Sequence, residues 1–337
     1  MNLQGLAGLA ISLACLAWVL KDVDLAQVWE LARQVNPLYV LAVNALLAVF
    51  FWLRSLRWRA LLRPVKELPL GPVVSANLIG FMANDLLPAR LGELVRAYAL
   101  DRLTGAPMTS VLATIVVERI LDGLTLLLIL FATLIFADPR AKAGAFDVAY
   151  LRAAGYTLLL AYLAVLALMA ALWRWPESTT GALSRLAGRL SPGLGQTAQG
   201  RLTTFAQGLA VLGHSKRLPL ILVQSLLIWL PMVLMYTMFL PALGLPFSLF
   251  LGAMAFAGGS LAGVIPAAPG YVGTFQLGVT WALMMGGADP ERAAAYSLVY
   301  WAIQYFPLVA AGLLAMWRGG MSLKSLRQGG GAPKETS

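Results

Sequence analysis

Charged residues are scarce in this chain. They make up 12% of its 337 residues, while 60% of the residues are hydrophobic. A soluble domain carries about 25% charged residues, so this composition excludes a soluble globular enzyme and a disordered chain. The apolar runs are long and continuous, whereas a membrane β-barrel would show short alternating strands. With a mean hydropathy of +0.77, we expect a helical membrane protein whose crossings each take about 20 apolar residues.

Cysteine and histidine are nearly absent, with Cys15 and His214 as the only examples. One cysteine excludes a disulfide framework and a cysteine metal cluster, and one histidine in a basic loop argues against a histidine metal site or a Ser/His relay. The chain also has no glycine-rich phosphate-binding loop ending in Gly-Lys-Ser or Gly-Lys-Thr. We therefore expect no metal, no cofactor, no catalytic residue and no ATP hydrolysis by this chain.

The net charge of +10 would suggest nucleic acid in a soluble protein. In a membrane protein, basic residues that gather between apolar runs are typical of cytoplasmic loops and of attraction to anionic lipid. We therefore predict membrane lipids as partners, anionic or phosphate-bearing, and no nucleic acid. A homodimer stays open.

Six apolar runs are expected to cross the membrane fully. They cover residues 3–20, 38–53, 109–137, 151–173, 219–240 and 292–316. Asn36-Pro37 is typical of a helix cap followed by a first turn. Residues 174–218 carry leucines at three- and four-residue spacing, which predicts amphipathic helices on the cytoplasmic membrane surface. The basic tail, residues 317–337, is expected to be disordered.

Two further apolar stretches, residues 72–99 and 247–285, are interrupted in the middle by proline, glycine and polar residues. Each predicts two short helices that meet at a break, as in a re-entrant hairpin. The breaks also align: Leu86-Leu87-Pro88-Ala89-Arg90-Leu91-Gly92 matches Val264-Ile265-Pro266-Ala267-Ala268-Pro269-Gly270 as apolar, apolar, Pro, Ala, x, x, Gly. The alternative is that proline and glycine merely kink two helices.

The order of these elements indicates an internal repeat. Residues 1–137 and 138–316 each read span, span, broken hairpin, span, and an odd number of crossings gives the halves opposite orientations. The most basic segments lie in the cytoplasm if the first hairpin enters from that side and the second from outside. The same scheme places Arg140 and Lys142 outside. The predicted fold is an all-α polytopic membrane protein with six spans, two broken re-entrant hairpins and inverted-repeat architecture. Both termini are then cytoplasmic.

Two breaks that face each other from opposite leaflets would line a polar cavity near the bilayer midplane. The freed helix ends would supply N–H donors, which suit phosphate. The residues expected to line this cavity are Asn84, Asp85, Arg90, Glu93, Arg96, Pro266, Gly270, Gly273, Thr274 and Gln276.

Three charged residues, Glu118, Arg119 and Asp122, lie inside the run 109–137. Helical rise places Glu118 roughly 14 Å deep, where an unpaired charge costs about 2.5–3.5 kcal/mol or more. At least one of the two acids should therefore have a tight basic partner or a raised pKa. An internal ion-pair network and a charged cavity wall or proton relay both stay open.

A second group, Arg54, Arg57 and Trp58, stands where the run 38–53 ends. We interpret these residues chiefly as an anchor at the membrane interface. A grip on a lipid phosphate is the alternative.

The motifs in chain order are Arg54-x-x-Arg57-Trp58, Asn84-x-Leu86-Leu87-Pro88-Ala89-Arg90-x-Gly92-Glu93-x-x-Arg96-Ala97, Glu118-Arg119-x-x-Asp122 and Pro269-Gly270-x-x-Gly273. Together they resemble the lysylphosphatidylglycerol synthase transmembrane-region family over nearly the whole chain. The resemblance implies a flippase-like protein of the bacterial inner membrane. Gln276 departs from the Glu that many relatives carry. No acyltransferase-like domain follows residue 316, so we do not expect lipid aminoacylation.

The sequence therefore predicts a flippase or scramblase-like transporter of a phospholipid or a polyprenyl-phosphate-linked headgroup. Arginines at positions 90, 96 and 119 would take the phosphate, and Glu93, Glu118 and Asp122 would balance it or take a cationic headgroup or protons. An intramembrane lipid-modifying enzyme is one alternative. A non-transporting partner of envelope glycosyltransferases is the other.

Overall fold

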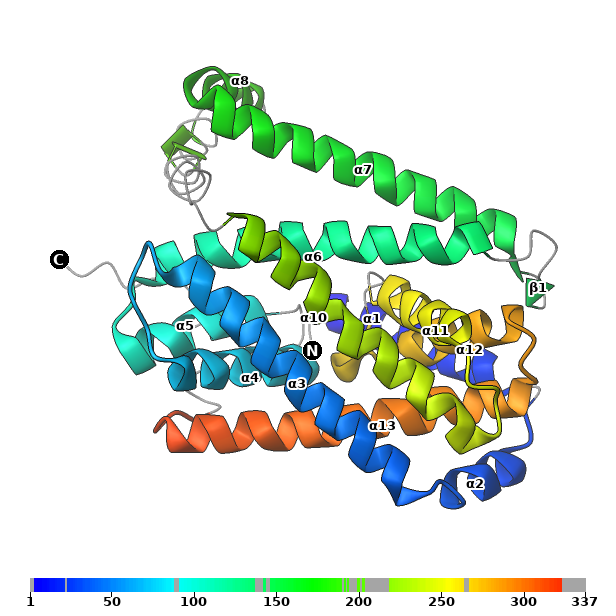
Figure 1. Ribbon diagram of the computed structural model, residues 1–337. Coiled ribbons are helices and arrows are strands. Elements are labelled where there is room, and N and C mark those ends of the chain that lie inside the picture. The colour runs from blue at the N-terminus through cyan, green and yellow to red at the C-terminus, as the bar shows by residue number, and fades with distance from the viewer. Residues whose placement is uncertain are drawn as a thin grey trace.

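The computed structural model describes residues 3–21, 23–87, 91–136, 142–143, 146–189, 191, 193, 199–200, 202–203, 218–263 and 267–322. These residues form a helical bundle (Figure 1) with one antiparallel pair of two-residue strands, β1 (Lys142–Ala143) and β2 (Phe146–Asp147). The helices of the first half are α1 (Leu3–Leu20), α2 (Leu25–Arg33), α3 (Pro37–Leu62), α4 (Leu70–Leu86), α5 (Gly92–Thr104) and α6 (Met108–Phe136). Those of the second half are α7 (Val148–Arg174), α8 (Pro176–Gly188), α10 (Leu218–Phe239), η2 (Leu240–Leu243), α11 (Leu249–Ala262), η3 (Pro269–Tyr271), α12 (Thr274–Met285) and α13 (Pro290–Arg318).

Four helices are long and apolar enough to cross a membrane. Their apolar stretches are Pro37–Leu62, Gly155–Leu172, Val223–Leu243 and Pro290–Arg318, and they correspond to four of the six expected spans. The other two expected spans lie in α1, whose apolar stretch Gly8–Leu20 is shorter, and in α6, which contains three charged residues. The helical class is therefore confirmed, and four of the crossings have the required length and composition.

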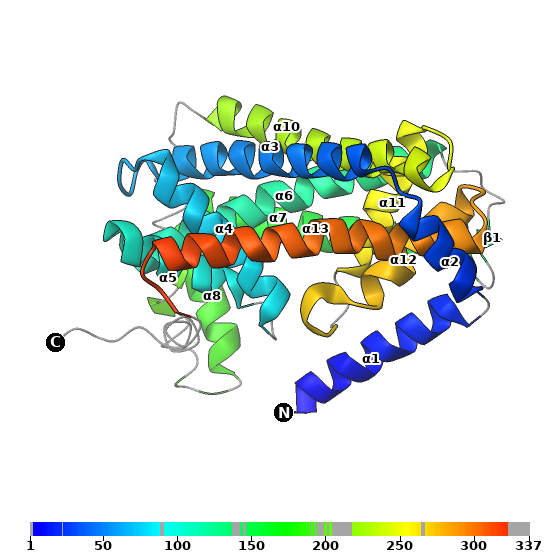
Figure 2. The same cartoon turned by 90° about the horizontal axis from the view of Figure 1, so that it is seen from below.

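Each interrupted stretch folds as two helices joined by a break, as the proline and glycine pattern predicts. The first gives α4 and α5, and the second gives α11, η3 and α12. The two members of each pair pack against each other. The α4–α5 pair lies toward one end of the long helices and the α11–α12 pair toward the other (Figures 1 and 2).

Glycines allow the two members of each pair to touch. A Cβ built on Gly80 would lie 2.5 Å from the Cβ of Arg96, and one on Gly258 would lie 2.2 Å from the carbonyl oxygen of Gly278. Real Cβ contacts are longer than this, so any larger residue would force the helices apart. Small residues therefore set the close packing of both pairs.

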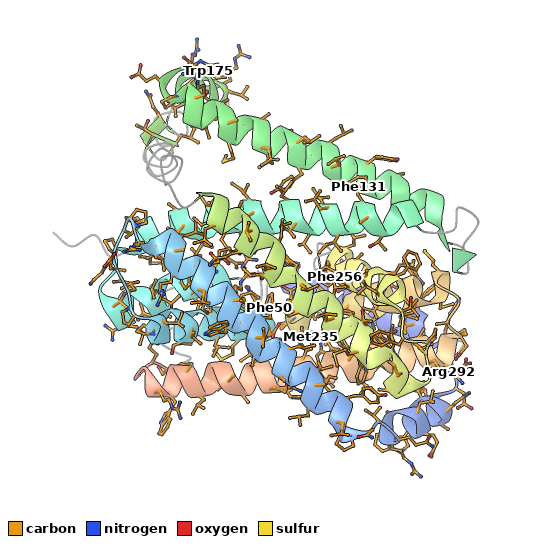
Figure 3. The ribbon with its side chains drawn as sticks, in the orientation of Figure 1. Phe50, Phe131, Trp175, Met235, Phe256 and Arg292 are labelled. Carbon is orange, nitrogen blue, oxygen red and sulfur yellow. The ribbon has the colours of Figure 1, made fainter. Side chains whose placement is uncertain are left out.

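The apolar core has two main parts. One surrounds α4, α5 and the end of α3, and the other lies among the earlier turns of α3 and helices α10, α11, α12 and α13. Phe50, Met235 and Phe256, which Figure 3 labels, belong to the second part. Helix α13 contacts α4 and α12 and runs past both pairs (Figure 2), and η3 contacts α4. The break of the second pair is thus brought against the first pair.

Two local features differ from the sequence interpretation. Helix α3 continues through Arg54 and Arg57 to Leu62, where an exit into a loop was expected, and the amphipathic helix α2 fills the expected first connection. Asp24 caps α2 by accepting hydrogen bonds from two backbone N–H groups.

The predicted cap at Asn36 is confirmed, because its side chain accepts from the N–H of Leu38 at 2.9 Å. Helix α8 lies in the predicted amphipathic segment, and most of the tail lies outside the described residues.

Candidate functional site

Two of the three arginines of helix α3, Arg54 and Arg57, lie one turn apart on its inner face. Both are buried, with exposed fractions of 1% and 0%, and Trp58 beside them is also fully buried. This placement corrects the expectation that these three residues anchor the helix at the membrane surface. The physical reason is that acidic partners on another helix neutralise the arginines, which lets α3 continue inside the protein.

Those partners are Glu118 and Asp122, which lie one turn apart on α6 and are both buried. Arg54 donates to Glu118 and, at 2.7 Å, to an oxygen of Asp122. Arg57 donates to the other oxygen of Asp122 at 2.6 Å and to the hydroxyl of Ser225 on α10 at 3.0 Å. The expected tight basic partner for this acid pair is therefore present.

Helix α5 completes the group with Arg96, which is 1% exposed. Its two terminal nitrogens donate to the two oxygens of Glu118 at 2.9 and 2.8 Å, a bidentate pair of the strong, directional kind. Its guanidinium also lies 3.5 Å from the centre of the Trp58 ring, where the negative face of the indole attracts a cation. We call Arg54, Arg57, Arg96, Glu118 and Asp122 the buried ion cluster.

The buried ion cluster holds three helices together. Placing five charges in an apolar interior is tolerated only when each is paired and hydrogen-bonded, because desolvation costs several kcal/mol per ion. Three arginines face two carboxylates, so the cluster carries one excess positive charge. The Nε atoms of all three arginines have no hydrogen-bond partner among the described residues. Aromatic rings offset part of the desolvation cost of the arginines. The guanidinium of Arg54 lies 5.0 Å from the ring centre of Phe81.

A half-exposed ion pair adjoins the buried ion cluster. Arg119 lies 3.1 Å from a carboxylate oxygen of Glu93, and their side chains are 40% and 29% exposed. The side-chain amide nitrogen of Asn84 donates to Glu93 at 3.3 Å. The side-chain oxygen of Asn84 accepts from the backbone N–H of Gly92, at the start of α5, at 2.8 Å. This pair therefore lies at the break of the first hairpin.

The second break is shaped by glycines with positive φ, Gly270 (76°) and Gly273 (89°). Trp301 of α13 donates to the carbonyl of Gly270 at 2.7 Å and stacks on Tyr305 with ring centres 4.6 Å apart. Gln276 accepts from the N–H of Gly273 at 2.6 Å and is 1% exposed. The side-chain amide of Gln276 thus caps the start of α12 through a local hydrogen bond and does not face a cavity.

The predicted site residues therefore fall into three groups. Asn84, Asp85, Glu93 and Arg119 are at least partly exposed around the first break. Arg96, Glu118 and Asp122 are buried and paired in the cluster, and Thr274 and Gln276 are buried at the start of α12. Arg90 and Pro266 lie outside the described residues.

The sequence analysis missed two polar partners. Ser225 accepts from Arg57 and Thr114 accepts from Trp58. Each is a single small polar residue in an apolar run, which gave no signal.

Two hollows lie elsewhere on the bundle. A 640 Å³ groove runs between α6, α10 and α11, and its lining is almost wholly apolar, with Thr125 and Thr133 as exceptions. A 350 Å³ pocket lies between the last turns of α3, the following loop and the first turns of α10. Its lining mixes apolar and charged residues: Leu56, Arg59, Ala60, Arg63, Glu67, Leu68, Leu220 and Gln224.

Comparison with known proteins gives a family match and two curated relatives. The family model described as "Lysylphosphatidylglycerol synthase TM region" matches residues 5–312. The chain is 26% identical to "Glycosyltransferase AglD" of Haloferax volcanii, over 92% of this chain and 53% of that protein. It is also 26% identical to a "UPF0104 membrane protein" of Methanothermobacter thermautotrophicus, over 94% of this chain and 96% of that protein.

The chain spans about half the length of the first relative and nearly all of the second. No solved structure matches it. The family match and the long apolar helices together make it a multi-pass membrane protein.

Proposed function

The chain belongs to the lysylphosphatidylglycerol synthase transmembrane-region family, and from this premise we propose that it moves the phosphate-bearing headgroup of a membrane lipid across the bilayer. The headgroup passes through a polar site between the two helix pairs while the lipid tails stay in the membrane. The protein acts as a flippase or scramblase-like transporter in the bacterial inner membrane.

The observation that carries this proposal is the half-exposed pair of Arg119 and Glu93 at the first break. Arg96 already makes a bidentate pair with Glu118 inside the protein. The guanidinium of Arg119, by contrast, is partly exposed and shares its main partner with Asn84. A phosphate that reaches Arg119 replaces Glu93 with a ligand of the same charge sign, which can also bind a guanidinium through two oxygens.

The buried ion cluster supports this step without touching the lipid in the described conformation. It fixes α3, α5 and α6 relative to one another, so that Arg119 on α6 and Glu93 on α5 keep their spacing. Its excess positive charge acts over a short distance through a low-dielectric interior, which favours an anion at the neighbouring break.

The architecture that fits this function has six spans, with both helix pairs as re-entrant hairpins in inverted halves. Several features support it. Pro88 and Pro266 are separated by the same number of residues as Gly80 and Gly258, and each of these glycines lies against the second helix of its own pair. The two pairs lie toward opposite ends of the bundle (Figure 1). Helices α4 and α11 then belong to opposite leaflets, and their breaks meet at the midplane.

The distribution of charge supports one orientation of this architecture. The ends of α3, α5 and α13 lie close together, because Lys66 donates to the carbonyl of Thr104 at 2.6 Å and Leu103 lies beside Gly319. This end also carries Arg63, Arg102 and Arg318. Basic loops favour the cytoplasm, so this end is cytoplasmic in our proposal, as are both termini.

The name of one relative bears on the cargo. A protein called a glycosyltransferase contains a region similar to nearly this whole chain. Within the proposal, this favours a polyprenyl-phosphate-linked glycan over a plain phospholipid. The same observation supports a second candidate function, in which the chain is a non-transporting membrane partner of an envelope glycosyltransferase.

A translocation assay in liposomes tests the proposal. Purified protein is reconstituted with headgroup-labelled phospholipid or polyprenyl-phosphate sugar, and the outward label is destroyed by a reagent that does not cross the membrane. We expect protein-dependent loss of the inner label, slowed about tenfold or more by Arg119→Gln, because a charge-assisted contact of roughly 1.5–3 kcal/mol is lost.

Arg102→Gln is the matched control, since Arg102 is an exposed arginine of α5 away from the break. Equal rates for wild type and Arg119→Gln would contradict the role of this arginine. Loss of transport together with an equal loss of stability would instead indicate a structural pair. If no labelled lipid moves, the partner hypothesis gains and the transporter hypothesis fails.

A further inference from the structure

A second feature of the bundle is independent of the break: the 350 Å³ pocket where α3 ends and α10 begins. Its volume is within the range of small-ligand sites, about 300–1,000 Å³. Its lining combines the apolar side chains of Leu56, Ala60 and Leu220 with three charged side chains, Arg59, Arg63 and Glu67, which we call the rim. A pocket with this division suits a ligand that has an anionic head and an apolar body.

The charges of the rim are not balanced. The Nε atom of Arg63 lies 2.5 Å from a carboxylate oxygen of Glu67, four residues further along the chain. Arg59 faces the same pocket and makes no ion pair with any residue that the structure describes. The rim therefore has one arginine engaged with a carboxylate and one arginine without such a partner, which leaves a net positive charge for an anion.

Gln224 adds a neutral polar group to the lining. Its Oε1 atom is buried and has no hydrogen-bond partner within the part of the chain that the structure describes. A buried amide oxygen without a partner is unfavourable. The amide group also carries two N–H donors, from which an anionic oxygen in the pocket would accept.

Exposed apolar side chains continue from the pocket along the outside of both helices. Trp52 on α3 is 52% exposed, and Leu220 and Leu227 on α10 are 51% and 49% exposed. Trp52 lies two turns before Arg59, on the same face of α3. Inorganic phosphate has no apolar part that could contact these exposed apolar side chains. The acyl chains of a lipid held by its headgroup would lie along them.

We propose that this pocket binds the phosphate of an anionic phospholipid from the surrounding leaflet. The phosphate lies between Arg59 and the amide of Gln224, and the first part of the acyl chains lies over Leu56 and Leu220. The site lies on the outside of α3, apart from Arg119 and the break, so it holds a resident lipid and not the transported one.

Lipid binding to the purified full chain in detergent tests this. Native mass spectrometry measures the retention of phosphatidylglycerol and of phosphatidylcholine over a series of lipid concentrations. We expect a preference for phosphatidylglycerol that falls about fivefold in Arg59→Gln, the factor that corresponds to about 1 kcal/mol for one basic residue near a membrane surface. Arg102→Gln, which removes the same charge from α5, should leave the preference as in wild type.

Glu67→Gln gives a change of the opposite sign. It removes the carboxylate that engages Arg63, so phosphatidylglycerol should bind several-fold more tightly than to wild type. Both variants change exposed side chains and leave the buried ion cluster intact. An increase in Glu67→Gln together with a decrease in Arg59→Gln supports the site.

Three results would overturn the proposal. Equal retention of the two lipids by wild type would show no recognition of charge. Equal losses in Arg59→Gln and Arg102→Gln would show attraction by the whole basic surface. Displacement of phosphatidylglycerol by inorganic phosphate at similar concentration would show a site for a soluble anion. None of these results depends on transport, so the site and the proposed function fail separately.

Discussion

Glu118→Gln should destabilise the protein much more than Arg96→Met, although these two side chains bind each other. The reason is the charge count of the buried ion cluster. With both residues present, three arginines face two carboxylates. Arg96→Met leaves two arginines and two carboxylates, a balanced group. Glu118→Gln leaves three buried arginines around Asp122 alone.

The expected magnitudes follow from these counts. Removal of one partner from a buried ion pair costs about 3–5 kcal/mol, because the remaining charge is left uncompensated. We expect a loss of this size in the free energy of unfolding for Glu118→Gln. For Arg96→Met, the stacking on Trp58 is lost, at about 2 kcal/mol. The variant also removes the desolvation cost of one buried cation, so the net loss in the free energy of unfolding should be about 2 kcal/mol or less.

Unfolding in mixed micelles with increasing sodium dodecyl sulfate, followed by tryptophan fluorescence, measures both values. Arg102→Met is the control on α5, and as a change of an exposed side chain it should stay within about 0.5 kcal/mol of wild type. Equal losses for Glu118→Gln and Arg96→Met would refute the argument from charge balance. A larger loss for Arg96→Met would mean that packing on Trp58 governs the cluster instead.

Three further predictions follow from the fold. Gly80→Ala should lower the free energy of unfolding by about 1–3 kcal/mol in the same assay, because the new Cβ meets Arg96. The control Gly71→Ala, with open space around it, should be neutral or slightly stabilising. Equal effects of the two variants would argue against tight α4–α5 packing. In a Cys15→Ala background, cysteine at position 105 should react with a membrane-impermeant thiol reagent from the cytoplasmic side and cysteine at position 287 from outside, whereas reaction of both from one side would exclude inverted hairpins. Asp122→Asn should also lower stability by about 3–5 kcal/mol, and wild-type stability in this variant would show that Arg54 and Arg57 do not need this carboxylate.

Local signals in the sequence predicted the breaks well. Proline and glycine interrupt helices through their own backbone chemistry, so the ends of α4 and α11 and the starts of α5 and α12 fall close to the expected positions. The cap at Asn36 is local in the same sense. Asp24 before an amphipathic run was an equally local signal for α2, and the sequence interpretation missed it.

The role of Arg54 and Arg57 was not predictable from their neighbours. Arginines after an apolar run are typical of a membrane interface, and their partners on α6 lie more than sixty positions along the chain. Only tertiary packing brings Glu118 and Asp122 to them. The same limit applies to the candidate site. The sequence analysis gave Arg96 and Arg119 the same expected role, whereas packing buries Arg96 and leaves Arg119 half-exposed.

The most direct test of the central claim follows one lipid in two ways in the same liposomes. Wild-type protein is reconstituted with a headgroup-labelled polyprenyl-phosphate sugar, and both the sidedness of the label and the mass of the lipid are measured over time. We expect the headgroup to reach the opposite leaflet with the mass of the lipid unchanged. A lipid of altered mass, or a label that stays on its original side at the rate of protein-free liposomes, would contradict it.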